Sequence, residues 1–141
     1  MNENQDLMLL KRLVSKKNLT LKNMNETERW LILSCAALTL QAGMFYSEVE
    51  VSLRLKQWLN AEGEMLRIDA IELRRTLIDS ALWSRSTNGR EYYLATLTNS
   101  HLAYEISRSL QRYDYLKLIR NWKTEHLLQR QERLAKFKPS A

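Results

Sequence analysis

Apolar residues recur at helical spacing over the middle of the chain. Between residues 48 and 60 the positions expected to face inward are Val51, Leu55, Trp58 and Leu59. These positions are separated by one, three or four residues, so they fall on one face of an α-helix. The pattern therefore predicts an amphipathic helix over residues 48–60.

Two start signals mark where helices begin. Ser47 precedes Glu50 by three residues, the spacing of a capping box in which each side chain binds the other residue's backbone amide. Asp69 precedes Glu72 by the same interval and predicts a second helix, which runs to about Ser80. Stepping 100° per residue gives this helix an inward apolar face. The residues on that face are Ala70, Leu73, Leu77, Ile78 and Ala81.

After the second helix the pattern changes to that of strands. The segments 83–85 and 91–94 flank Asn88 and Gly89, a dipeptide that tolerates the positive φ angles of a tight hairpin turn. Two capped helices followed by a hairpin are the order of a winged-helix module. We therefore predict a mainly α fold with a small β-hairpin: a winged helix-turn-helix core with N- and C-terminal helical extensions.

Specific residues within this core carry a family resemblance. They are Tyr46-Ser47-Glu48, Glu50-Val51, Asp69, Leu73-Arg74-Arg75, Leu77-Ile78-Asp79, Arg85, Gly89 and Tyr92 or Tyr93. In this pattern the chain resembles the bacterial family called domain of unknown function 2087, over residues 21–94 at the widest. The resemblance implies a winged helix and regulation through nucleic-acid binding.

The remaining residues form two flanking segments. We expect an N-terminal basic helical arm over 1–24, the winged-helix domain over 25–95 and a C-terminal helical extension over 96–141. Helical periodicity runs from His101 to about Lys136, with a break at Asp114. An aromatic stripe in the last helix is predicted to be an oligomer interface that forms a homodimer; the alternative is that it docks on the N-terminal helix of the same chain. The stripe consists of Tyr115, Leu118, Ile119 and Trp122.

An uncharged run from Trp30 to Tyr46 raises the question of a membrane span. The run is marginal in length and is interrupted by Ser34, Thr39 and Gln41. These features favour a buried central helix over a span, so we expect no membrane association. The single cysteine, Cys35, and the lack of an apolar leader favour a cytoplasmic protein.

Positive charge lies mainly in the two flanks. Residues 1–24 carry five basic and two acidic side chains, residues 25–95 carry eight and ten, and residues 96–141 carry nine and four. The central module is thus slightly acidic within a chain of net charge +6. The basic flanks fit either phosphate contacts or the solvated faces of amphipathic helices.

The outward face of the second helix tests direct DNA reading. Glu72, Arg75, Thr76 and Asp79 lie on this face, whereas Arg74 points toward the core and is predicted to form a structural ion pair with Glu48. Two acids on the outward face oppose phosphate binding. The arginines beside the hairpin turn are the better candidates for backbone contacts. The predicted nucleic-acid-binding residues are Arg75, Thr76, Arg85, Arg90, Arg112, Lys117 and Arg120.

Catalytic signals are weak. The two histidines, His101 and His126, lie far apart in sequence and lack neighbours at metal-ligand spacing, and no glycine-rich phosphate loop is present. We expect no enzyme activity, no metal and no cofactor. Two functions remain: a regulator that binds duplex DNA, and an adaptor that binds another protein through the winged helix and the aromatic terminal helices.

Overall fold

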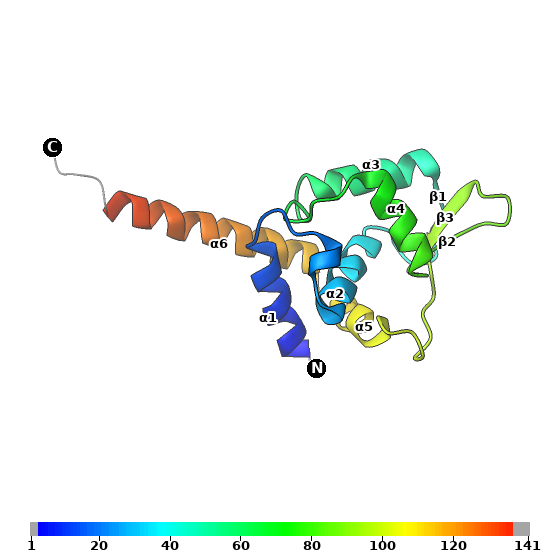
Figure 1. Cartoon of the computed structure of the whole chain (residues 1–141), viewed down its shortest axis with the longest axis horizontal. Coiled ribbons are helices and arrows are strands. Elements are labelled where there is room, and N and C mark those ends of the chain that lie inside the picture. Colours follow the sequence, from blue (N-terminus) through cyan, green and yellow to red (C-terminus); the bar gives the residue numbers. More distant parts are fainter. Residues whose placement is uncertain (1–2, 137–141) are drawn as a thin grey trace.

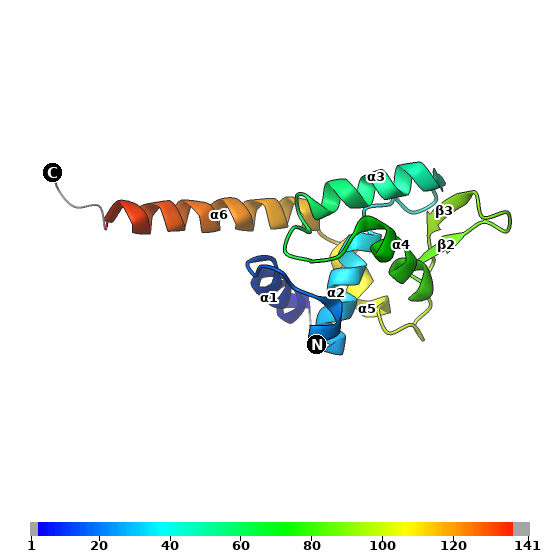
Figure 2. The same cartoon turned by 45° about the horizontal axis from the view of Figure 1, so that its top comes forward.

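The computed structural model describes residues 3–136, which form a mainly helical chain with one small sheet (Figure 1). Its elements are α1 (Glu3–Val14), the 3-10 turn η1 (Leu21–Asn23), α2 (Glu26–Ala37), β1 (Tyr46–Ser47), α3 (Glu48–Leu59), α4 (Ala70–Asp79), β2 (Trp83–Arg85), β3 (Glu91–Leu94), α5 (Tyr104–Gln111) and α6 (Tyr115–Lys136). α6 extends away from the body on one side, and the β2–β3 hairpin extends on the other (Figures 1 and 2).

The helix starts follow local capping chemistry. The Ser47 hydroxyl accepts the Glu50 amide and the Glu50 carboxylate accepts the Ser47 amide, so the predicted capping box at α3 is confirmed. Asp69 accepts the Glu72 amide at 2.8 Å and caps α4 as expected. α2 begins with a further capping box between Asn25 and Glu28.

α2 is the central helix of the body. Every residue from Leu31 to Ala37 is buried, which accounts for the uncharged run in this part of the sequence. α1 and α5 both pack against it. In the described part of the chain, no helix combines the length and the apolar character needed to cross a bilayer.

The sheet has three antiparallel strands in the order β1-β3-β2. Asn88 accepts the Arg90 amide and the Ser86 hydroxyl, and Gly89 adopts a φ of 72°, so the predicted turn is present. β1 was not predicted, because two residues are too few to show alternation. It pairs Tyr46 with Tyr92 and thereby attaches the start of α3 to the hairpin.

Ala81 corrects the expected inward face of α4, because its side chain is exposed. The Ala81 amide donates to the Ile78 carbonyl and the Leu82 amide donates to the Leu77 carbonyl. This is a Schellman ending, in which the residue after the cap adopts a left-handed conformation. The φ of Ala81 is 62°, so alanine occupies a position that favours glycine.

Ala81→Gly is therefore expected to raise the free energy of unfolding by about 0.5–1 kcal/mol. The left-handed conformation costs an L-residue about 1–2 kcal/mol, and the greater freedom of glycine in the unfolded chain offsets part of that gain. Urea titration measures the change. Ser80→Gly, at a φ of −82°, is the control and should lower stability; a loss for Ala81→Gly as well would contradict the assignment.

The terminal helices belong to the same core as the central module. Leu10 and Leu13 of α1 are buried, as are Ala103, Tyr115 and Ile119 from the C-terminal segment. The Tyr115 hydroxyl donates to the Cys35 carbonyl at 2.5 Å, and burial raises the pKa of this phenol. The flanks are thus integrated into the fold rather than appended to it.

This packing corrects the predicted oligomer interface. Tyr115 and Ile119 are buried within one chain, so they are not exposed to a second subunit. The Tyr115 hydroxyl bonds to Cys35 of α2, whereas the alternative placed the stripe on the N-terminal helix. Leu118 and Trp122 are partly buried. The homodimer itself stays a prediction.

Asp6 of α1 is a buried carboxylate with an exposed fraction of 4%. Its Oδ1 has no hydrogen-bond partner among the residues that the structure describes, and burial raises the pKa of the carboxyl above its ordinary value of 3.8. Between 3.8 and the raised pKa the folded chain binds a proton that the unfolded chain has released. This group therefore lowers stability as the pH rises through that window, and its cost is complete above the raised pKa.

Asp6→Asn is expected to stabilise the chain at pH 7 by about 1 kcal/mol, because an amide avoids the cost of burying a charge. The difference should shrink as the pH falls through the raised pKa and vanish below about pH 3, where the folded and unfolded carboxyls are both largely protonated. Thermal unfolding of the two proteins between pH 3 and 7 measures it. A constant difference across this range would show that ionisation of Asp6 is not the cause.

Candidate nucleic-acid interface

α4 presents one face to the core and one to solvent. Leu73 and Leu77 are buried and pack toward α3. On the outward face Arg75 is exposed, together with Glu72 and Asp79. Thr76 is half-buried, and its hydroxyl donates to the Glu72 carbonyl at 2.9 Å. Arg75 is therefore the freest predicted DNA-contacting group of this helix.

Arg74 connects α4 to α3. Its Nη1 lies 3.1 Å from Glu48 Oε1 and 2.8 Å from Ser52 Oγ, so the predicted ion pair with Glu48 is present. The Arg74 side chain is 15% exposed; the Glu48 carboxylate compensates its charge, and the Ser52 hydroxyl accepts a hydrogen bond from it. Its guanidinium also lies 5.9 Å from the centre of the Tyr92 ring.

The hairpin supplies two exposed arginines. The Arg85 guanidinium lies 5.9 Å from the Tyr92 ring, the same distance as that of Arg74. Tyr92 is 2% exposed and thus links β3 to both arginines. Arg90 is exposed beside the turn and forms no ion pair within the described part of the chain. Sequence reasoning missed the roles of Ser52 and Tyr92, because partners from different elements leave no local pattern.

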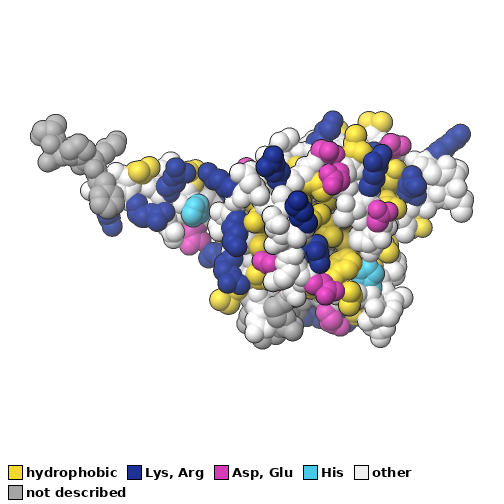
Figure 3. Space-filling view, in the orientation of Figure 1, with side chains coloured by type: hydrophobic (Ala, Val, Ile, Leu, Met, Phe, Trp, Pro, Cys, Tyr) yellow, Lys and Arg dark blue, Asp and Glu magenta, His cyan; other side chains and the backbone are white. Residues whose placement is uncertain are grey.

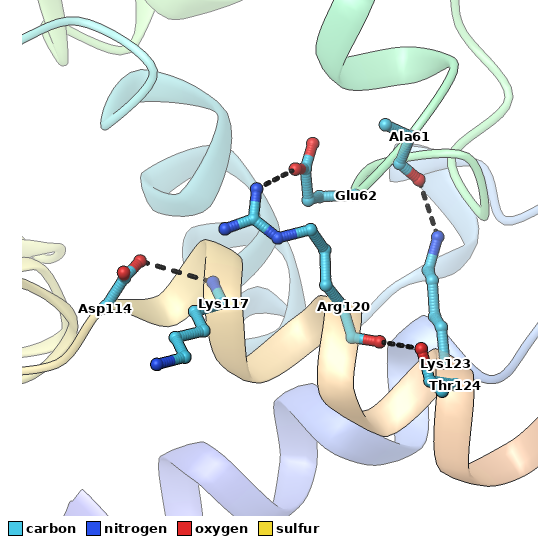
Figure 4. A network of polar contacts seen from close by, with 7 residues as sticks. All are labelled: Ala61, Glu62, Asp114, Lys117, Arg120, Lys123 and Thr124. Carbon is cyan, nitrogen blue, oxygen red and sulfur yellow. Dashed lines mark hydrogen bonds and ion pairs between the residues drawn. The ribbon is translucent and has the colours of Figure 1, made fainter.

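The predicted DNA-contacting residues at the start of α6 differ in how far their side chains are bound to the body of the protein. Arg120 pairs with Glu62 at 3.3 Å, and the neighbouring Lys123 donates to the Ala61 carbonyl at 2.6 Å (Figure 4). Lys123 also lies 3.0 Å from Glu64. These contacts hold α6 against the loop that follows α3. The ion pair of Arg120 therefore helps to hold α6 in place and leaves this side chain less free to bind DNA.

The other two residues of this group, Arg112 and Lys117, are exposed. The Lys117 backbone amide donates to Asp114 Oδ1 at 3.2 Å, while the Lys117 side chain points away from Glu62 (Figure 4). α6 leaves the body away from the hairpin (Figures 1 and 2). The predicted residues therefore form two groups, one on α4 and the hairpin and one at the start of α6.

The histidines and the cysteine have structural surroundings. His101 Nδ1 accepts the Ala103 amide, so Nε2 carries the proton and donates to the Ser80 carbonyl at 2.8 Å. Its ring also meets Trp30 edge to face. Cys35 is fully buried, and burial raises the pKa of its thiol. Within residues 3–136, no three His, Cys, Asp or Glu side chains gather to hold a metal ion.

These features define a mainly helical protein with a small three-stranded antiparallel sheet and exposed arginines on a helix and a hairpin. The chain belongs to the family DUF2087, described as an uncharacterized protein conserved in bacteria, whose sequence profile matches residues 18–94. No curated protein and no solved structure matches the chain significantly. The matched segment runs from the residues before η1 to the end of β3.

Proposed function

We propose that this chain is a non-catalytic, DNA-binding transcription regulator of the winged-helix type. The order α2-β1-α3-α4-β2-β3, with a sheet order of β1-β3-β2, fits that fold. In this interpretation α4 is the recognition helix and the β2–β3 hairpin is the wing.

The observation that carries the proposal is the placement of Arg75, Arg85 and Arg90. Arg75 is exposed on α4, and the other two are exposed on the adjoining hairpin. Arg74 and Tyr92 fix these two elements relative to each other from the buried side. A helix and a hairpin held in this way present cations to neighbouring phosphates while the helix enters a major groove. Arg112, Lys117 and Arg120 are a second, separate source of phosphate contacts.

Fluorescence anisotropy with labelled duplex DNA of random sequence tests the proposal. The full chain should bind at low salt, and its affinity should fall steeply as salt rises. The variant Arg85→Ala/Arg90→Ala should lose about tenfold in affinity, and its salt dependence should decrease by about one counterion for each lost contact. Both side chains are exposed, so the fold should persist by circular dichroism.

The matched control is Arg133→Ala/Lys136→Ala, which removes the same charge from exposed positions in the last turn of α6. It should lower the affinity by no more than about threefold, since only the general attraction of net charge is lost. Equal losses in the two variants would contradict a role for the wing. Absence of binding at low salt would reject DNA binding altogether.

A protein-interaction adaptor is the second candidate function. The outward face of α4 carries the acids Glu72 and Asp79, which oppose phosphate, and Ile71 is 51% exposed beside them. On α3, Val49 and Leu53 are 78% and 54% exposed. Exposed apolar side chains that lie near charges are typical of protein interfaces. This function predicts no DNA binding in the anisotropy experiment.

A further inference from the structure

A large groove lies between α1 and α6, away from the wing. The first half of α6 packs on the body through Tyr115, Ile119 and Trp122, whereas every residue from Thr124 to Lys136 is exposed. α6 thus continues beyond the body beside α1 (Figure 2). The space between the two helices has a volume of about 1370 Å³, and Glu64 and Met65 line it from the loop after α3.

The groove has an apolar lining and is large enough to hold a helix. Leu9, Val14, Met65 and Trp122 line it as buried or partly buried side chains, and Leu127 stands on its wall at 53% exposure. Small-molecule sites usually occupy about 300–1,000 Å³, so this space exceeds them. Its lining on α6 runs from residue 122 to residue 130, a rise of about 12 Å, which matches two to three turns of a partner helix.

The rim of the groove is basic. Lys123 is neutralised locally by Glu64 at 3.0 Å. The other basic lining residues form no ion pair within the described part of the chain, and Glu125 is the remaining acid of the lining. Figure 3 shows Lys and Arg side chains gathered where α6 leaves the body. The unpaired basic residues are Lys11, Arg12, Lys16, Lys17 and Arg130.

We propose that this groove binds an acidic amphipathic helix of a partner protein. The apolar face of that helix would cover the groove floor, and its acidic residues would face the basic rim. A second copy of the chain is a poorer occupant. The part of α6 that would enter carries four basic residues, Lys123, Arg130, Arg133 and Lys136, against Glu125 and Glu132, so like charges would meet. This site is independent of DNA binding by the wing.

A designed peptide of about 14 residues tests the proposal directly, with leucines at i, i+3, i+4 and i+7 and glutamates at most other positions. Labelled peptide is titrated with the full chain, and anisotropy is read. Leu127→Gln should weaken binding by about tenfold, because it places an amide on the apolar wall. Leu128→Gln is the matched control: Leu128 is 54% exposed on the same helix but does not line the groove, so binding should stay within about twofold.

A second peptide, with the leucines replaced by glutamines at the same charge, separates docking from general attraction. It should bind at least about tenfold more weakly than the first. Equal binding of the two peptides, or equal effects of Leu127→Gln and Leu128→Gln, would overturn the proposal. Circular dichroism checks that each variant is folded.

The rim is tested by Lys16→Gln/Lys17→Gln, which should lower peptide affinity and flatten its salt dependence. Light scattering and DNA competition address the other occupants. The chain could form a dimer that Leu127→Gln dissociates and to which the peptide does not bind. That result would assign the groove to a second copy and overturn the proposal. Displacement of the peptide by duplex DNA, with DNA binding itself sensitive to Leu127→Gln, would assign it to nucleic acid and overturn it as well.

Discussion

Replacing Gly63 by alanine is expected to lower the free energy of unfolding by about 3 kcal/mol. A Cβ built at Gly63 would lie 2.3 Å from ring carbons of Trp58, well inside van der Waals contact. Trp58 is 2% exposed, so its ring has no free space in which to move. The Gly63 amide also donates to the Trp58 carbonyl at 2.7 Å, which fixes the backbone at the same place. Thermal unfolding should show a melting temperature lower by about 10 °C.

Gly43→Ala is the control for this prediction. Gly43 has a φ of +80° but no atom within 4 Å of the added Cβ, so the substitution costs only backbone strain, about 1 kcal/mol. If the Gly63→Ala and Gly43→Ala proteins have the same free energy of unfolding, Gly63 is packed less tightly against the Trp58 ring than the structure shows. The loop at Gly63 also carries Glu62 and Glu64, which hold Arg120 and Lys123. Its displacement should therefore loosen the base of α6.

Local signals predicted the central module well. The capping residues Ser47 and Asp69 placed the starts of α3 and α4, and the dipeptide Asn88-Gly89 placed the hairpin. Each of these signals acts within a few residues, through a backbone amide or a turn dihedral. The pairing of Arg74 with Glu48 was also accessible, because helical periodicity alone put both side chains on facing surfaces.

Contacts between distant segments were not accessible in the same way. The bond from the Tyr115 hydroxyl to the Cys35 carbonyl joins residues 80 positions apart, and a helical stripe does not reveal which surface will cover it. The sequence therefore left open whether Tyr115 faced a second subunit or its own chain. The same limit applies to the groove, whose lining comes from α1, α6 and the loop after α3. Its basic rim was visible only as two charged flanks.

Replacing Trp83 by alanine is expected to cost about 4 kcal/mol, the largest effect among these variants. Trp83 begins β2 and is 1% exposed, and its indole Nε1 donates to the Ala37 carbonyl at the end of α2 at 2.9 Å. The side chain therefore anchors the β2–β3 hairpin to the central helix. Urea unfolding followed by circular dichroism measures the loss. If the β2–β3 hairpin supplies DNA contacts, Trp83→Ala introduced into a stabilised variant of the chain should also weaken DNA binding.

Two phenylalanine variants separate the hydrogen bond from the packing. Trp83→Phe removes the indole donor, so that among the described residues the Ala37 carbonyl keeps the Leu40 amide as its donor, at 3.3 Å. Trp58→Phe makes a similar change in size at an equally buried tryptophan whose Nε1 has no partner in the described part of the chain. Trp83→Phe should therefore be less stable than Trp58→Phe by about 1–2 kcal/mol. If the order is reversed, the bond to α2 is not what holds the hairpin in place, and the anchoring must come from the apolar contacts of the ring alone.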